Sequence, residues 1–329
     1  MKNFLIAENT TSPYLKNPSF SGHQTFPFRY TWLKKGVDAV REKSTVFSLE
    51  DASVTLGVGK NMVDSIRYWC GVSGLIKVKS NQLQLDLREK GGTRQHKQFV
   101  LTELGKAIFG DQNRKGFDPY LEDPATLWLI HWKIASNINQ ATSWYWAFNI
   151  LKKNPFTLST FKEELSEWTR QQKASMRPVS PNTLHRDVNC FIRTYCQSRY
   201  NSNAAVAEET FNCPLVELDL ITELPDNNGY AFQRGEKETL PIEIFTATLI
   251  AFWDVCFPGR ETLPFSDLMY KSLSPGRLFR LDEEAMVIYL ENLEQLTNRA
   301  LEYGESEGLK QVYRRKDLNP MELLKEYYG

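Results

Sequence analysis

The chain has 329 residues, of which 41% are hydrophobic and 24% are charged, so it can build a sizeable core. At roughly 100–200 residues per domain, this length predicts two or three domains. No stretch approaches the roughly 18–20 apolar residues of a membrane span, and the N-terminus lacks a cationic start followed by a long apolar segment. We therefore expect a soluble, cytoplasmic protein with no membrane partner. The five cysteines form no CxxC pair, which favours buried thiols over disulfides or a zinc site.

Acidic and basic residues balance over the whole chain, with a formal net charge of +0, but they are unevenly distributed. Residues 60–106 hold nine Lys/Arg against four Asp/Glu, a balance of +5, and residues 170–199 hold six against one, again +5. Residues 208–243 hold two against nine, a balance of −7. Because a local positive field attracts a polyanion, the two basic segments are candidates for contact with nucleic acid. The alternative for each is an ordinary solvated face.

The first basic segment begins with the pattern of a helix-turn-helix. Residues 29–42 are predicted as a helix, and Ser48 as the N-cap of the next helix, with acidic residues in its first turn. Two glycines in residues 57–59 then make a short turn. A helix follows, with apolar side chains at i, i+3/i+4 and i+7 over residues 62–70. Two helices joined by a tight glycine turn are the sequence form of a helix-turn-helix.

The residues that follow predict the wing of a winged helix-turn-helix. Residues 75–79 and 82–88 alternate polar and apolar side chains, as strands do, and the glycine-rich, basic residues 89–97 are the candidate wing tip. Residues 99–101 are predicted as the returning strand, and Thr102 as the N-cap of a further helix. The candidate DNA contacts of this unit are Lys60, Asn61, Arg67, Lys77, Lys79, Arg94 and Lys97.

A second candidate DNA-binding helix lies in the other basic segment. Residues 125–151 are apolar on most faces and predict a buried pair of helices. Beyond them, Ser159 is the candidate N-cap of one helix, and residues 182–195 predict another with a single acid. Arginine binds phosphates or guanine edges and asparagine pairs with adenine, so its polar face suits duplex DNA; a plain surface helix is the alternative. Its candidate contacts are Asn182, His185, Arg186, Asn189 and Arg193.

The last part of the chain predicts short strands and then helices. Residues 211–224 and 230–233 have strand character, residues 242–255 form an apolar helix after Pro241, and the residues beyond 265 resemble a third helix-turn-helix. We therefore predict a mainly α (α+β) fold of tandem winged helix-turn-helix units joined by a buried helical connector. The predicted parts are an N-terminal tail (1–17), a winged helix-turn-helix domain (18–115), the connector (116–155), a second winged-helix-like domain (156–240) and a C-terminal helical, winged-helix-like domain (241–329).

Residues 21–29 form the first cluster with chemical potential. Polar side chains lie there among aromatic ones, just before the first predicted helix. In this cluster His23 is a candidate catalytic acid/base, and Arg29 is a candidate ligand for a phosphate. The alternative is a capped loop whose histidine satisfies backbone groups.

Three carboxylates within six residues form the second cluster. Asp118, Glu122 and Asp123 suit Mg²⁺ or another divalent cation in phosphodiester cleavage, and Asp118 and Glu122 are candidate catalytic groups. Because prolines stand beside these acids, turn and cap roles are the alternative. The sequence indicates no organic cofactor.

Six short motifs occur in order along nearly the whole chain. They are S-G-H-Q-T-F-P (21–27), W-L-K-K-G (32–36), L-G-V-G-K-N-M-V (56–63), F-D-P-Y-L-E-D-P (117–124), T-L-W-L (126–129) and S-P-G-R (274–277). Together they resemble the SspB-type family, whose members accompany bacterial DNA phosphorothioation systems. The resemblance implies a protein that nicks one DNA strand so that sulfur can replace a non-bridging phosphate oxygen, in self-marking and anti-phage defence.

The resemblance also implies partners. These are double-stranded DNA, a cysteine desulfurase, an ATP-pyrophosphatase-like sulfurtransferase and an ATPase. The family pattern usually has Glu after the loop histidine, whereas this chain has Gln24, which cannot act as a general base or a strong metal ligand. Two non-enzymatic alternatives stay open: a winged-helix DNA-binding adaptor or transcription regulator that recruits partner enzymes, and a protein-interaction scaffold.

Overall fold

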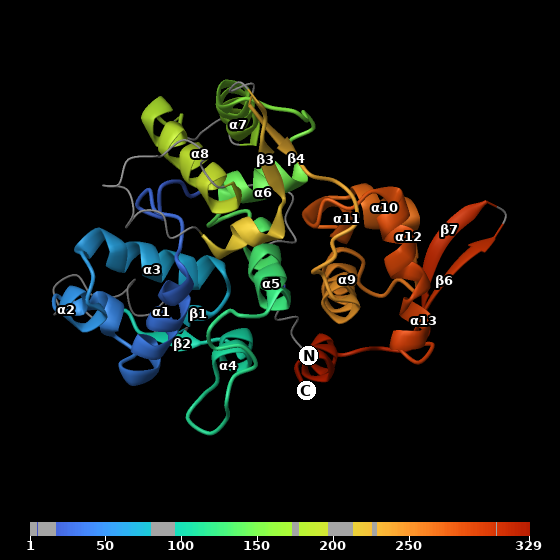
Figure 1. Cartoon of the computed structure of the whole chain (residues 1–329), viewed down its shortest axis with the longest axis horizontal. Coiled ribbons are helices and arrows are strands. Elements are labelled where there is room, and N and C mark those ends of the chain that lie inside the picture. The colour runs from blue at the N-terminus through green and yellow to red at the C-terminus, as the bar shows by residue number, and fades with distance from the viewer. Residues whose placement is uncertain are drawn as a thin grey trace.

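A computed structural model describes residues 5, 18–79, 96–172, 178–196, 213–225, 229–306 and 308–329. Most of this part of the chain is helical, and its strands form small antiparallel sheets of two or three strands (Figure 1). The mainly α, α+β class predicted from the sequence is therefore confirmed. Over the same residues, no helix has both the length and the apolar character needed to cross a membrane.

The N-terminal part contains helices on both sides of a glycine turn. Its elements are α1 (Tyr30–Glu42), the 3₁₀ helix η1 (Val46–Ser48), α2 (Ala52–Leu56), α3 (Lys60–Val72), β1 (Ile76–Val78), β2 (Phe99–Leu101) and α4 (Glu103–Phe109). Gly57 ends α2 with a φ of 61°, in the left-handed region that favours glycine. Strand β1 pairs antiparallel with β2. The predicted strand at 82–88 and most of the predicted wing tip at 89–97, including Arg94, lie outside the described residues.

One of the two caps predicted in this part is present. The Thr102 side chain accepts a hydrogen bond from Gly105 N at 3.0 Å and caps α4 as predicted. The prediction for Ser48 is wrong, because this residue lies inside η1 and its hydroxyl donates to Lys97 O at 2.9 Å. Helix α2 begins only after Asp51. Ser48 therefore holds the chain that returns toward β2 and does not cap a helix.

The central part of the chain contains two almost fully buried helices. Its elements are α5 (Pro124–Ala135), α6 (Thr142–Asn149), α7 (Leu158–Gln172), α8 (Pro181–Tyr195), the 3₁₀ helix η4 (Pro214–Leu218), β3 (Ile221–Glu223) and β4 (Tyr230–Phe232). Every residue of α6 is buried, and so is every residue of α5 after its first. The predicted buried helix pair is thus confirmed.

His131 lies inside α5 and ties it to two other elements. Its Nε2 donates to Leu278 O at 2.8 Å, and its Nδ1 accepts from the Tyr195 hydroxyl at 2.8 Å. Burial lowers the pKa of His131 to about 3. The neutral imidazole therefore links α5 to α8 and to the C-terminal part without carrying a charge.

Two predictions for the central part are wrong in detail. Ser159 does not cap a helix, because it lies one residue inside α7, where the Thr157 hydroxyl accepts from Thr160 N at 3.2 Å. In the described portion of the predicted strand at 211–224, η4 comes first and only β3 is extended. Pro214 starts η4, since its fixed φ and missing N–H suit the first turn of a helix.

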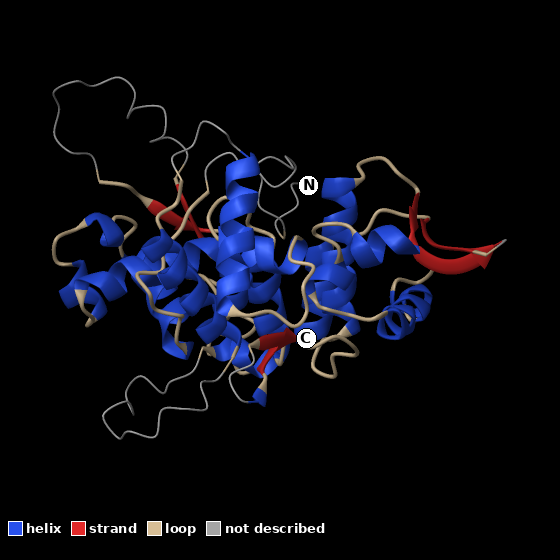
Figure 2. Ribbon diagram, turned by 90° about the horizontal axis from the view of Figure 1, so that it is seen from above, coloured by secondary structure: helices blue, strands red, loops and turns tan. Residues whose placement is uncertain are grey.

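The C-terminal part begins with the apolar helix predicted after Pro241. Its elements are α9 (Ile242–Cys256), β5 (Thr262–Pro264), α10 (Phe265–Tyr270), α11 (Pro275–Leu278), α12 (Glu283–Glu291), α13 (Leu293–Leu296), β6 (Leu301–Ser306), β7 (Leu309–Arg314) and α14 (Pro320–Tyr328). The sequence did not predict the hairpin of β6 and β7, which projects from the body of the molecule (Figure 2).

The central and C-terminal parts share one order of elements. In the central part, Phe156 bridges to β4, and β4 pairs with β3, so the spatial order is first, third, second. In the C-terminal part the sheet order is β5–β7–β6, again first, third, second. A helix precedes the first extended segment in each part, and further helices lie between the first and second segments. Among the α-helices between the first and second segments, the last with more than four residues is α8 in the central part and α12 in the C-terminal part, and we compare these two.

Candidate nucleic-acid interface

Helix α8 presents a polar, cationic face to solvent. Asn182, His185, Arg186 and Arg193 are exposed, and the half-buried Asn189 donates to His185 Nε2 at 3.0 Å. Neither arginine forms an ion pair with any other residue that the structure describes. The structure thus places all five predicted residues on one side of α8, where no described acid pairs with the two arginines.

The one acid of α8, Asp187, lies on the opposite, buried side of the helix. It is 1% exposed and accepts hydrogen bonds from His23 Nε2 at 2.8 Å and from Ser21 N at 2.6 Å. The Ser143 hydroxyl donates to its second oxygen. Because this negative charge is satisfied inside the protein, it does not offset the arginines on the outer face.

A buried set of four side chains connects α3 to α8; we call His23, Asp187, Ser143 and Ser65 the His23 network. His23 is 1% exposed, and its Nδ1 accepts from Thr25 N at 3.0 Å, so the ring proton is on Nε2 and is donated to Asp187. Ser65, in α3, donates its hydroxyl to His23 O at 2.9 Å. The loop before α1 therefore holds α3 and α8, the two helices that the sequence predicts to contact DNA, in a fixed relation to each other.

The loop that carries His23 has an unusual backbone. Ser21, Gln24 and Thr25 have φ values of 61°, 50° and 69°, which non-glycine residues seldom adopt. A Cβ on Gly22 would lie 2.5 Å from the Tyr68 ring, so only glycine fits beneath that ring. The hydrogen bonds to Asp187 hold this shape. Gln24, where the family pattern usually has Glu, is exposed next to the buried histidine.

The predicted contacts of the N-terminal part fall into three groups. Arg67 is half-buried and forms an ion pair with Asp64 at 3.1 Å. Arg94 lies outside the described residues. The remaining residues are exposed and form no ion pair with another described residue: Lys60, Asn61, Lys77, Lys79 and Lys97.

The other predicted catalytic residues lie apart from the His23 network. Arg29 stands at the start of α1, with its guanidinium 5.6 Å from the centre of the Trp32 ring. Asp118 is 6% exposed, and its two oxygens accept from Glu122 N at 2.9 Å and Asp123 N at 3.1 Å. The Glu122 side chain is exposed.

The carboxylates of Asp118 and Asp123, beside α5, bind backbone N–H groups. Asp123 caps α5 by accepting from Ala125 N at 2.8 Å, and Asp118 is bound to backbone N–H groups through both oxygens. Within the described residues, no three His, Cys, Asp or Glu side chains gather where they could hold a metal ion. The arrangement fits the turn and cap roles of Asp118 and Asp123, and a cation site at Asp118, Glu122 and Asp123 stays a prediction.

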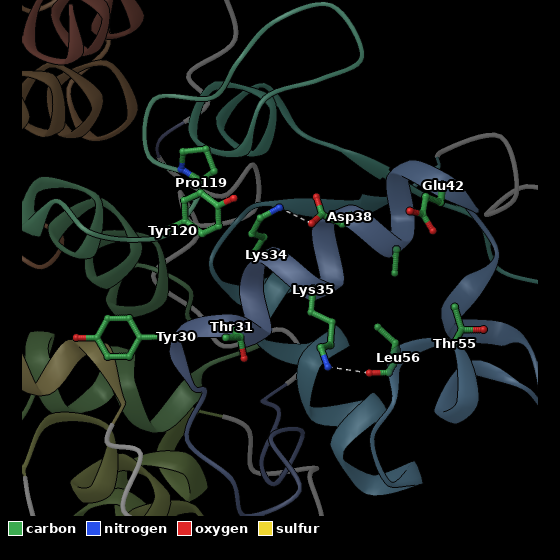
Figure 3. A pocket seen from close by; sticks show the side chains of 11 residues that line it. Tyr30, Thr31, Lys34, Lys35, Asp38, Glu42, Thr55, Leu56, Pro119 and Tyr120 are labelled. Carbon is green, nitrogen blue, oxygen red and sulfur yellow. Dashed lines mark hydrogen bonds and ion pairs between the residues drawn. The ribbon is translucent and has the colours of Figure 1, made fainter.

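A hollow of about 430 Å³ lies along α1, and Pro119 and Tyr120, which follow Asp118, form part of its lining (Figure 3). Its lysines already have partners: Lys34 forms an ion pair with Asp38 at 2.6 Å, and Lys35 donates to Leu56 O at 2.9 Å. None of the predicted site residues lines it. Its lining consists of Tyr30, Thr31, Lys34, Lys35, Asp38, Ala39, Glu42, Thr55, Leu56, Pro119 and Tyr120.

Sequence reasoning missed Asp187 as a site residue. The signal was present, because Asp187 falls next to Val188 and three residues after Leu184, on the apolar side of the predicted helix. An acid on the inward face needs a buried partner. That partner, His23, is 164 residues away in the sequence, and only the fold brings the two together.

A protein-family model matches residues 20–328 of the chain, and it describes DUF4007, a family of proteins of unknown function. The chain belongs to the DUF4007 family. Two SspB crystal structures share its fold. One, magnesium-bound, is 24% identical with a TM-score of 0.80 and covers 98% of this chain and 90% of that chain. The other is 24% identical with a TM-score of 0.78, and the match covers 100% of this chain and 90% of that chain. These likenesses agree with the SspB-type resemblance of the motifs. Among curated protein sequences, none matches the chain.

Proposed function

We propose that this DUF4007 protein is a duplex-DNA-binding component of a phosphorothioate modification system, and that α8 makes its main DNA contact. One observation carries the proposal: the outer face of α8 holds asparagines and two arginines that form no ion pair within the described residues, while its one acid is buried against His23. Guanidinium groups suit phosphates and guanine edges, and asparagine suits adenine. Counter-ion release would then make binding strongly dependent on salt.

The position of α8 in the chain supports the same function. It follows α7 and precedes the β3–β4 hairpin, and the first extended segment, Phe156, pairs with the last strand. We assign this order to a winged helix whose last helix is α8, and the equivalent order in the C-terminal part to another. In helix-turn-helix proteins the second helix of the motif lies in the major groove. This assignment places the cationic face of α8 in the groove.

The His23 network gives α3 a supporting role at the same duplex. Ser65 in α3 and Asp187 in α8 both bind His23, so the two helices keep a fixed relation to each other. The exposed Lys60 and Asn61 at the start of α3 would then contact the backbone beside α8. In this assignment His23 is a positioning residue, because both of its ring nitrogens are already bound inside the protein.

Strand nicking is the finer proposal, and it rests on the SspB-type resemblance. On the same resemblance we propose that the protein acts in the cytoplasm. Its partners would be a cysteine desulfurase, a sulfurtransferase and an ATPase. The geometry supports DNA binding more directly than cleavage, because His23 and Asp118 are taken up by internal hydrogen bonds. Arg29 and Glu122 keep accessible side chains and stay candidates for contact with a scissile phosphate.

Two assays test the binding and cutting proposals separately. Fluorescence anisotropy with a labelled duplex, from about 50 to 200 mM salt, should show affinity that falls steeply with salt. A lack of salt-dependent binding would contradict the DNA-binding function and leave the protein-interaction scaffold. Incubation with supercoiled plasmid and Mg²⁺ then separates a nickase, which produces open circles, from an adaptor that binds without cutting. The matched control is Arg299→Ala, a substitution of an exposed arginine already paired with Glu294 and Glu302.

A further inference from the structure

Three arginines come together where the end of β4 meets α11, away from the outer face of α8. Gly235 N donates to Arg280 O at 3.1 Å, which brings the neighbouring Arg234 to the turn after α11. Arg277 lies in α11 itself, three residues before Arg280. Arg234 is exposed, Arg277 is half-buried and Arg280 is 3% exposed. The cluster thus runs from the surface into the interior.

The buried member of the cluster has few partners for a charged group. Its Nη2 donates to Ala147 O at 2.6 Å, and its guanidinium lies 3.6 Å from the centre of the Phe232 ring. Its Nε is buried and has no hydrogen-bond partner among the described residues. Arg280 also adopts a φ of 56°, in the left-handed region where glycine is usual. A buried guanidinium at such a position is costly unless an opposite charge compensates it.

The neighbouring charges make this cost larger. Arg277 and Arg234 both lower the pKa of Arg280, after burial itself, and Arg234 also lowers that of Arg277. No carboxylate among the described residues is within ion-pair distance of any of the three. Other arginines in the described chain do form ion pairs, such as that between Arg314 and Asp254 at 2.5 Å. The carboxylate of Asp282 lies beside Gly235 without pairing with an arginine, and Arg277 donates its Nε–H to Tyr270 O at 3.2 Å. The buried Arg280 therefore has no carboxylate partner among the described residues.

We propose that Arg234, Arg277 and Arg280 form a binding site for a phosphate group. Guanidinium groups bind the oxygens of phosphate through paired N–H donors, and a phosphate held by the exposed Arg234 and the half-buried Arg277 supplies negative charge close to the buried Arg280. The phosphate belongs either to a nucleic-acid backbone or to a nucleotide. The site is separate from the α8 face and does not depend on the function proposed for that face.

Thermal unfolding in added phosphate tests this site. We expect inorganic phosphate or ATP to raise the Tm of the wild-type protein by roughly 2–4 °C over potassium chloride of equal ionic strength. The double variant Arg234→Gln/Arg277→Gln should lose this rise. Both substitutions lie toward the surface, so they spare the buried Arg280. Arg299→Gln, at an exposed arginine with two carboxylate partners, should keep the rise.

The outcomes separate this site from the function proposed for α8. A rise that persists in Arg186→Ala/Arg193→Ala and disappears in Arg234→Gln/Arg277→Gln supports the site, even if no duplex binds. A larger rise with ATP than with phosphate or duplex identifies a nucleotide, and duplex affinity reduced in the cluster variant identifies a nucleic-acid backbone. No rise in the wild-type protein with phosphate and ATP, or an equal rise in the cluster variant, would overturn the proposal.

Discussion

Helices α8 and α12 lie in two parts of the chain that share one strand order, yet their outer faces differ in charge. The exposed face of α8 carries Arg186 and Arg193, while its one acid is buried. Helix α12 contains three glutamates and no basic residue, and it is capped by Asp282. The shared order therefore does not determine the partner. We infer that surface charge distinguishes the two helices, since like charges repel and the glutamates of α12 disfavour a phosphate on its outer face.

Charge reversal on α8 should have the largest effect on duplex binding and so should separate α8 from α12 most clearly. We expect Arg186→Glu/Arg193→Glu to weaken duplex binding by about 4 kcal/mol, or roughly 1,000-fold, and to lower the salt slope by about 2. Anisotropy titrations over a salt series measure both quantities. The matched change on α12, Glu284→Lys/Glu291→Lys, should not weaken binding. Equal losses in both variants would show that α8 has no special role.

Removal of His23 should show that α8 depends on an internal anchor. We expect His23→Ala to lower the free energy of unfolding by about 3 kcal/mol, because Asp187 would lose its buried partner. Urea denaturation measures this loss, and His185→Ala, at an exposed histidine, should change stability by less than about 0.5 kcal/mol. Unchanged stability in His23→Ala, with loss of any nicking activity, would support a catalytic histidine and contradict the positioning role.

Acid should destabilise the contact between α8 and α5. The pKa of His131 is about 3 in the folded protein, below its ordinary value of 6.5, because the ring is buried. Between these values the unfolded chain binds the extra proton, so the stability is present above about pH 6.5 and is lost as pH falls toward 3. The contribution of His131 to the free energy of unfolding should fall by about 2 kcal/mol between pH 7 and pH 5. An NMR titration of His131 with a midpoint near 6.5 would contradict this.

Substitutions in α3 should have the smallest effects. We expect Lys60→Ala to weaken duplex binding by about 1 kcal/mol and to lower the salt slope by about 1, as for one phosphate contact. Arg67→Ala should cost less, because Arg67 already pairs with Asp64. The same anisotropy series measures both variants. A larger loss from either than from the α8 double variant would make α3 the main contact and reverse the proposed order.

Local patterns in the sequence predicted much of this fold. The Gly57 turn, the Thr102 cap and the cationic face of α8 all depend on residues close together in the chain, so spacing alone reveals them. The hairpin of β6 and β7 was missed, although each strand has six residues and the two pair directly over six positions.

The candidate site was predicted less completely, because its roles depend on distant contacts. The motif around His23 did not reveal that His23 binds Asp187 in α8 and Ser65 in α3, or that Ser143 in α6 donates to Asp187. Ser48 was predicted as a helix cap, but its hydroxyl donates a hydrogen bond to Lys97 O. A motif does not reveal whether its polar side chain is buried or which distant residue that side chain binds.

Hydrogen exchange with and without duplex DNA tests the central claim most directly, since it compares α8 and α12 in one experiment. We expect added duplex to slow amide exchange in peptides that cover α8 and the start of α3, and to leave peptides over α12 unchanged. Slower exchange in α12 with none in α8 would contradict the assignment of α8 as the main DNA contact.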